Sequence, residues 1–275
     1  DQQRYDTICA MGYDFMETPN LDRLAAEGCC YPNAYSSNPV CMAARHQIIT
    51  GLTARYHGFD DNYFESDPKT IPFDLPTLPQ LLSDAGYDTI AIGKMHFQPC
   101  RRHNGFTKME LMEEIPRYLE DDEYAKYLKE NGYGHLQSPH GVRHLLYMVP
   151  QRSLIPEEHH GSTWVAKRSV YHLKENAGKR SFFLWSSFIA PHPPFDVPEK
   201  WADLYKGKEL PPLKESKTPI SGIAEWKKYI ADYPNESYLR RARELYYASI
   251  SFVDYNIGTI LQQLKDMGCL LYTSP

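Results

Sequence analysis

The sequence has no long hydrophobic run and no excess of positive charge. Its longest apolar stretch, 182–190, is interrupted by two serines and is far too short to cross a bilayer. The 275 residues hold 30 Lys and Arg against 35 Asp and Glu, so the formal net charge is −5 and the pI is about 6.1. These features argue against a membrane-spanning protein and against a basic nucleic-acid-binding protein. An anionic substrate would need a local cluster of cations, because the overall field repels it.

The 6 cysteines have neither the paired spacing of a zinc site nor the density of a disulfide scaffold. We predict that most of them are reduced and structural. The sequence also lacks internal repeats and low-complexity tracts. With 42% hydrophobic and 24% charged residues, it has the composition of a globular chain that can bury a sizeable core.

Helical and strand-like segments alternate along the chain. Short apolar runs predict buried strands at 88–93 and 181–190. Apolar spacing and terminal Pro or Gly residues predict helices at 18–28, 43–52, 75–85, 162–176 and 238–267. The alternation predicts an α/β fold, namely a three-layer α/β/α sandwich around a largely parallel mixed sheet.

Two stretches, 98–160 and 196–235, show no clear period and are rich in loops. We interpret both as insertions on the substrate side of the core. At the two ends of the chain, before Asp1 and after Gly268, the apolar strands that a buried parallel sheet needs are missing. We therefore expect residues 1–275 to be part of a longer protein, without its first strand and its C-terminal portion.

The segment around Cys41 could carry chemistry. Cys41 lies at the start of a predicted helix, and Arg45 follows four residues later on the same helical face. Backbone N–H groups at a helix N-terminus favour negative charge, so the pattern indicates a nucleophile beside an anion-binding site. The spacing alone fits a buried structural cysteine and a surface arginine equally well.

The region around Cys41 contains, in order, Cys-Met-Ala-Ala-Arg at 41–45, Thr50-Gly51, Tyr-His-Gly at 56–58 and Asn62. In this order the residues resemble the signature of type I sulfatases, which belong to the alkaline-phosphatase-like superfamily. The resemblance implies that Cys41 is converted to Cα-formylglycine, whose aldehyde hydrate is the nucleophile. It also implies the alkaline-phosphatase-like form of the α/β sandwich.

Three further segments resemble the family in the same order: Asp-Gln-Gln-Arg at 1–4, Gly-Lys-Met-His at 93–96 and Ala-Pro-His-Pro-Pro-Phe at 190–195. The first resembles the family's metal-binding turn. The resemblance therefore implies that Asp1 and Gln2, with modified Cys41, hold one divalent cation. Calcium is our first assignment, and Mg²⁺ or Mn²⁺ are alternatives.

The resemblance also implies roles for four other side chains, and the position of a fifth, His160, before a predicted helix makes it a further candidate. Arg45 and Lys94 would supply fixed positive charge to a sulfate group. His96 and His192 are candidates for proton transfer and for holding the sulfate. Each of these residues taken singly fits an ordinary surface or hydrogen-bonded position, and only their family order favours function. His160 is a candidate for the substrate pocket; alternatively, it is an exposed residue near a helix start.

The implied reaction is hydrolysis of a sulfate ester to an alcohol and inorganic sulfate. The partners would be a small-molecule or glycan sulfate ester and a formylglycine-generating maturation enzyme. Ala43 replaces a proline found in many members, which suggests maturation by an anaerobic-type radical enzyme.

The family's second metal-ligand pair and a later lysine are missing from these 275 residues. We therefore expect this partial catalytic domain to bind metal poorly and to be inactive by itself, although its parent would be active. The alternatives are a phosphonate monoester or phosphodiester hydrolase with the same nucleophile, an inactive anion-binding pseudoenzyme, and a thiol-based hydrolase. The thiol-based hydrolase would not explain the segments at 1–4 and 93–96. Substrate and location stay open.

Overall fold

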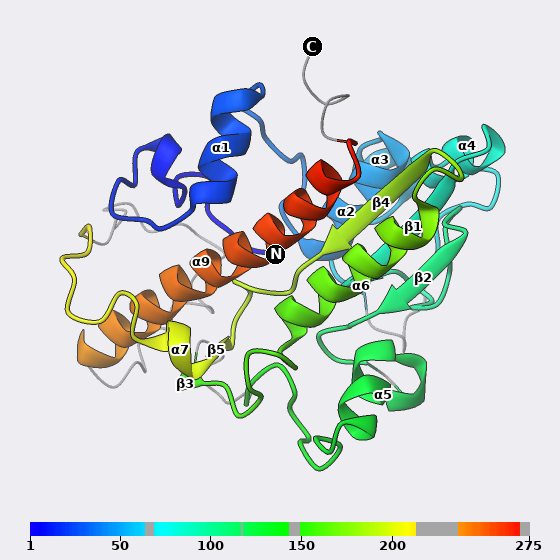
Figure 1. Ribbon diagram of the computed structural model, residues 1–275. Coiled ribbons are helices and arrows are strands. Elements are labelled where there is room, and N and C mark those ends of the chain that lie inside the picture. Colours follow the sequence, from blue (N-terminus) through cyan, green and yellow to red (C-terminus); the bar gives the residue numbers. More distant parts are fainter. Residues whose placement is uncertain (64–68, 117, 143–148, 213–235, 270–275) are drawn as a thin grey trace.

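The computed structural model describes residues 1–63, 69–116, 118–142, 149–212 and 236–269 (Figure 1). Its central sheet consists of β1 (Asp88–Gly93), β2 (Lys108–Leu111) and β4 (Phe182–Ser187). The order is β2-β1-β4 and both pairings are parallel, with Ile90 opposite Lys108 on one side and Leu184 on the other. A second parallel pair joins β3 (Pro150–Arg152) to β5 (Phe195–Val197).

Helices cover both faces of the central sheet. Ile90 and Ile92 of β1 pack in one apolar cluster with Trp164 of α6 (Gly161–Asn176), and α9 (Glu236–Asp266) packs beside α6. Ala91 points to the other face, into a cluster with Met42 of α2 (Cys41–Thr50). Successive side chains of a strand point to opposite faces, so a strand buried on both sides reads as the continuous apolar run seen in β1. These layers confirm the predicted three-layer α/β sandwich.

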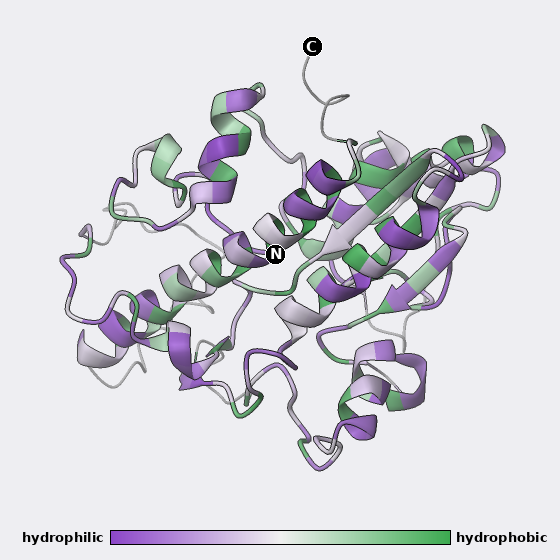
Figure 2. Cartoon of the chain, in the orientation of Figure 1, coloured by the Kyte–Doolittle hydropathy of each residue, from purple (hydrophilic) through white to green (hydrophobic). Residues whose placement is uncertain are grey.

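The remaining helices lie around this core. On the α2 side are α3 (Ala54–His57) and α4 (Leu78–Asp84), whereas α1 (Pro19–Glu27) and α7 (Glu199–Ala202) pack on α9. A further helix, α5 (Glu123–Glu130), contacts β2, and two short 3₁₀ turns, η1 and η2, span Cys9–Met11 and Leu119–Asp121. Hydrophilic and hydrophobic positions alternate along α6 and α9 (Figure 2). Among the described helices, none is long and apolar enough to cross a membrane.

All five predicted helices and both predicted strands are present, although β4 ends three residues before the predicted 190. The stretch 98–160, which shows no clear period in the sequence, contains α5 and also β2, a strand of the central sheet. The sequence did not predict β2, because the carboxylate of Glu110 within the strand interrupts its apolar pattern. In the fold, Arg168 and His172 of α6 each form a hydrogen bond of 2.6 Å with that carboxylate, and Arg168 supplies the opposite charge. In 196–235, residues 213–235 lie outside the described part.

Helix α2 is held by its buried side, which includes His46. The His46 ring stacks on Phe59 with ring centroids 3.9 Å apart, and its Nδ1–H donates to the Met42 carbonyl at 2.7 Å. Burial lowers the pKa of His46 from 6.5 to about 4. The ring is therefore neutral at neutral pH and packs as part of the core.

This packing makes stability depend on pH. Between pH 6.5 and pH 5 the unfolded chain protonates His46 and the folded chain does not, so acidification favours unfolding. We expect about 2 kcal/mol of stability to be lost through His46 over that range. Urea unfolding of wild type and His46→Asn at pH 7 and pH 5 measures the effect. The wild type should lose about 2 kcal/mol more than the variant. Equal losses would contradict this expectation, and exposed His135→Asn is the control.

Gly93 ends β1 at the point where the chain turns out of the sheet. Its φ is +96°, and a Cβ at this position would overlap the carbonyl oxygen of Ser187 in β4. The Lys94 N–H donates to the same carbonyl at 3.1 Å. A glycine is required here for two reasons. The backbone of residue 93 is left-handed, and the backbone of β4 lies too close to leave room for a side chain.

Gly93→Ala should lower the free energy of unfolding by about 3 kcal/mol or more, because strain and overlap with backbone act together. Gly86→Ala is the matched control. Its φ of +90° is similar, but a Cβ there meets nothing within 4 Å. The control should lose about 1 kcal/mol. Chemical denaturation of both variants compares them, and an equal loss would show that overlap with Ser187 contributes nothing.

Candidate active site

The motifs of the sequence converge at one end of the central sheet. Lys94 directly follows β1, His192 lies in the loop after β4, and Cys41 is the first residue of α2. Asp1 lies beside them, where its backbone nitrogen donates to the Phe188 carbonyl at 3.1 Å. Open parallel sheets bind ligands at the carboxyl ends of their strands, so the position is typical of a functional site.

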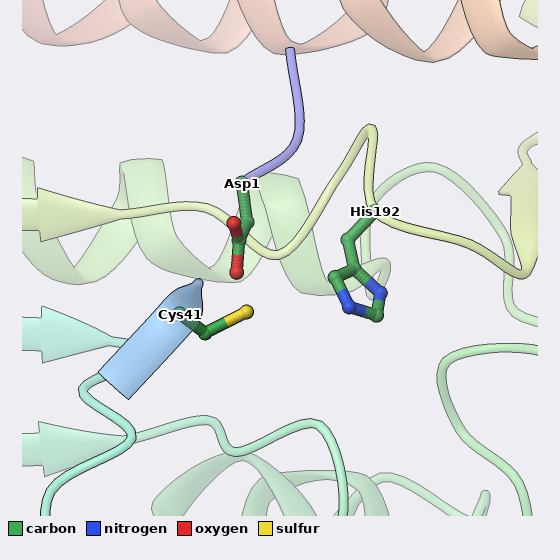
Figure 3. A group of neighbouring side chains, drawn as sticks. All are labelled: Asp1, Cys41 and His192. Carbon is green, nitrogen blue, oxygen red and sulfur yellow. The ribbon is translucent and has the colours of Figure 1, made fainter. Parts of the chain in front are cut away.

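Three side chains form the centre of this site. A carboxylate oxygen of Asp1, the Cys41 sulfur and a ring nitrogen of His192 all lie within 4.8 Å of one another. Figure 3 shows them reaching a common space from the chain start, the first turn of α2 and the loop after β4. The N-cap Val40 is extended, and the first turn begins with the Ala44 N–H donating to its carbonyl. The remaining N–H groups of this turn favour negative charge near Cys41.

Lys94 is the most buried charge of the site, with a side chain that is 0% exposed. Its Nζ lies 2.7 Å from Asp1 Oδ2, 2.7 Å from Glu114 Oε2 and 3.8 Å from Cys41 Sγ. A buried ammonium group is stable only when carboxylates or hydrogen bonds compensate its desolvation. Both carboxylates are therefore part of what allows a lysine at this position.

Arg45 connects α2 to the ends of two strands. Its Nη1 donates to the Lys94 carbonyl and, at 2.9 Å, to the Ser187 hydroxyl. Its Nη2 lies 3.6 Å from Asp1 Oδ2. The guanidinium is buried and planar, so these contacts set both the position of the helix and the direction of the charge.

The two histidines, His96 and His192, differ in their contacts. His192 Nδ1–H donates to the Pro193 carbonyl at 2.6 Å, and Nε2 lies 3.3 Å from Glu114 Oε2. His96 has a left-handed backbone with φ of 51°. Burial, together with the positive charge of Lys94, lowers the pKa of His96 to about 3, so its ring is neutral at pH 7. Its buried Nδ1 lacks a hydrogen-bond partner within the described residues.

Gln2 and His160 lie outside this cluster. Gln2 is exposed, with φ of 58°, and its carbonyl accepts from the Tyr246 hydroxyl at 3.1 Å. His160 is the N-cap of α6, where its Nδ1 accepts from the Ser162 N–H at 3.1 Å. It also lines a small cavity together with His192. The structure thus places His192, not Gln2, next to Asp1 and Cys41.

The sequence analysis missed two adjacent carboxylates that follow β2. Glu113 is buried, and its Oε1 accepts from the backbone N–H groups of Met95 and His96 at 2.9 Å each. Burial raises the pKa of Glu113. Glu114 reaches Lys94 and His192. The available signal was a pair of acidic residues at the end of a strand, but it required recognition of β2.

Among the described residues, Asp1, Cys41 and His192 are the one group of three ligand-type side chains close enough to share a metal ion. A hard divalent cation requires about six oxygen donors. Asp1 supplies a carboxylate, and Cys41 would supply oxygen only after conversion of its thiol. Asp1 and converted Cys41 could therefore bind one side of such an ion, and they account for only part of the six oxygen donors.

Comparison with known proteins agrees with the motifs. A family model described as "Sulfatase" matches residues 1–274. An arylsulfatase of Clostridium perfringens is 31% identical over 295 residues, which cover 98% of this chain and 59% of that protein. A choline-sulfatase of Rhizobium meliloti is 28% identical over 267 residues, which cover 91% and 50%. The structure of a phosphonate monoester hydrolase of Agrobacterium radiobacter superposes with a TM-score of 0.76 at 21% identity, over 98% of this chain and 58% of that one.

The structural likeness establishes the alkaline-phosphatase-like fold of sulfatases, with helices on both faces of a parallel sheet. The chain spans 59% and 50% of the length of the two curated relatives. Because the family model covers almost every residue and a sulfatase relative is 31% identical, the chain belongs to the sulfatase family.

Proposed function

We propose that this protein hydrolyses sulfate esters to an alcohol and inorganic sulfate. The observation that carries the proposal is the position of Cys41. It lies at a helix N-terminus, 3.8 Å from a buried ammonium group and within 4.8 Å of Asp1 and His192. A nucleophile surrounded by fixed positive charge and backbone N–H groups suits attack on a tetrahedral anion.

Lys94 and Arg45 would bind the nonbridging oxygens of the sulfate group. Both are buried and held by hydrogen bonds, so they need little reorganisation when charge develops. Neutral His96 adds a hydrogen-bonding ring beside them. Uptake of an ester therefore exchanges contacts with carboxylates for contacts with sulfate oxygens.

His192 is our candidate for proton transfer to the leaving alcohol. Its Nδ1 proton is engaged by the Pro193 carbonyl, so Nε2 is the ring atom that gains or loses a proton. In the neutral ring, Nε2 can accept a proton. Once protonated, it can donate that proton to the alcohol oxygen as the bond from this oxygen to sulfur breaks. A ring anchored at Nδ1 keeps Nε2 directed toward the same point throughout.

Members of the sulfatase family generally use a divalent metal ion and a formylglycine. We propose that Cys41 is the residue converted, by a separate maturation enzyme, and that its aldehyde hydrate supplies the attacking oxygen. We assign Ca²⁺ to Asp1 and converted Cys41, with the Gln2 side-chain amide as a further donor, because oxygen donors suit hard cations. Such an ion would make an oxygen nucleophile available at neutral pH.

We propose sulfate esters of small molecules or glycans as substrates, and we propose that loops within 98–160 and 196–235 select among them. The arylsulfatase and choline-sulfatase relatives favour sulfate over other esters. Phosphonate monoesters are the second candidate, because the neighbour with a TM-score of 0.76 hydrolyses that class. Both substrates carry one negative charge on a tetrahedral centre. The kcat/KM for an aryl sulfate and for the phosphonate monoester of the same phenol separates them.

The role of Cys41 is tested in the intact protein by Cys41→Ala. Hydrolysis of an aryl sulfate should fall at least about a thousand-fold, because the nucleophile is removed. Mass spectrometry of the wild-type peptide around residue 41 should show an aldehyde in place of the thiol. Exposed Cys30→Ala is the control and should retain wild-type activity. An unmodified thiol together with an active Cys41→Ala variant would refute the proposal.

The metal assignment is tested by removal and return of Ca²⁺. Treatment with a chelator should lower aryl sulfate hydrolysis at least about ten-fold, and Ca²⁺ should restore it. Added Ca²⁺ should also raise the melting temperature of the wild type, because a ligand that binds the folded state stabilises it. Asp1→Asn should weaken this shift. Better recovery with Mg²⁺ or Mn²⁺ would overturn the calcium assignment, and no dependence on metal would overturn the site.

A further inference from the structure

Glu114 places a carboxylate between two groups that a sulfate ester would need. Its Oε2 lies 2.7 Å from Lys94 Nζ and 3.3 Å from His192 Nε2. The Glu114 side chain is 10% exposed and that of His192 is 3% exposed, so little water screens the contact. One oxygen atom of the protein therefore occupies the position in which an oxygen of the substrate would meet both residues.

Binding of a sulfate group must displace this carboxylate from Lys94 and His192. Two anionic oxygens cannot share the same donors at contact distance without strong repulsion. Glu114 thus acts as an internal anion that competes with every anionic ligand. Because every anionic ligand must displace the same carboxylate, this competition alone weakens the binding of all of them to a similar extent.

The displaced carboxylate cannot move far, because the backbone beside it is anchored. The Glu113 N–H donates to Asp122 Oδ2 at 2.6 Å, and the Glu113 carboxylate accepts from the N–H groups of Met95 and His96. Asp122 is in turn the N-cap of α5 and accepts from Ala125. A glutamate side chain that swings about this fixed point stays within about a Debye length of the bound anion. Its repulsion then scales with the charge of that anion.

The proposed reaction changes this charge. Water converts an ester monoanion, ROSO₃⁻, into an alcohol, ROH, sulfate dianion, SO₄²⁻, and a proton. Cleavage of the ester bond to sulfur therefore raises the charge on the tetrahedral anion from −1 to −2. A nearby carboxylate repels the product about twice as strongly as the substrate.

We propose that Glu114 is a specificity-determining residue that discriminates monoanions from dianions in this site. It favours binding of monoanionic esters, disfavours dianions such as phosphate monoesters, and promotes release of inorganic sulfate. This inference rests on the proposed function. The carboxylate is a positioning and charge-setting group, and the reacting atoms bond to other residues.

The test is calorimetric binding of two stable anions to the intact protein at pH 7. Inorganic sulfate is the dianion, and methanesulfonate is a monoanion with three sulfur-bound oxygens and a carbon–sulfur bond that resists hydrolysis. Glu114→Gln removes the charge at nearly constant shape, and Glu114→Asp keeps it. Glu130→Gln, on the exposed end of α5, changes the net charge of the protein by the same amount as Glu114→Gln.

Glu114→Gln should tighten binding of both anions and raise the affinity ratio of sulfate over methanesulfonate by about ten-fold, a change of about 1.4 kcal/mol. Glu114→Asp and Glu130→Gln should leave the ratio within about two-fold of wild type. Inhibition by sulfate during aryl sulfate hydrolysis should strengthen in parallel. An unchanged ratio in Glu114→Gln, or an equal change in Glu130→Gln, would overturn the inference.

Wild-type binding provides a second measurement that needs no folded variant. If Glu114 acts as proposed, wild type binds methanesulfonate at least as tightly as sulfate; a sulfate affinity more than about ten-fold higher would overturn the inference. Failure of the proposed function gives a different result. It would show as absent turnover of aryl sulfates by wild type, whereas turnover with an unchanged anion ratio would reject only the role of Glu114.

Discussion

The ammonium group of Lys94 has no exposure to water, and the arrangement of the site follows from this. A buried cation is stable only beside negative charge, and Lys94 obtains it from two carboxylates distant in the sequence, Asp1 and Glu114. One comes from the chain start and the other from the segment after β2. Gly93 permits the turn that places the lysine there, because its left-handed backbone passes close to β4. Three separate segments are therefore brought together around one charge.

Arg45 extends this constraint to Cys41, the proposed nucleophile. Its guanidinium bonds to the Lys94 carbonyl and to Ser187 of β4, so α2 is fixed to the ends of two neighbouring strands. Cys41 lies one turn earlier on the same helix, and its position follows from that attachment. The same arginine thus supplies positive charge and orients α2. The spacing of four residues between Cys41 and Arg45 is informative because it places both side chains on the same face of this helix.

Much of the fold could be predicted from the sequence, since the helices have clear apolar stripes and β1 is a continuous apolar run. The strand β2 could not, because Glu110 breaks its pattern, and the partners of that carboxylate, Arg168 and His172, come from α6 only in the folded protein. Glu113 and Glu114 depend on β2 for their position, so they were missed with it. The ordered motifs located Cys41, Lys94 and His192, yet their distances arise from long-range packing that no local pattern encodes.

The balance of charge explains what such a site requires before it can bind an anion. Lys94 and Arg45 contribute two positive charges, and Asp1 and Glu114 contribute two negative ones, so these four side chains are formally neutral together. The chain as a whole has a net charge of −5 and adds no attraction. Withdrawal of Glu114 or engagement of Asp1 by a divalent cation would each give the pocket a positive charge. These four side chains therefore attract an anion only when Glu114 withdraws or Asp1 is engaged by a divalent cation. Which anions the site can hold then depends on this coupling between anion binding and the loss of negative charge, more than on the number of cations present.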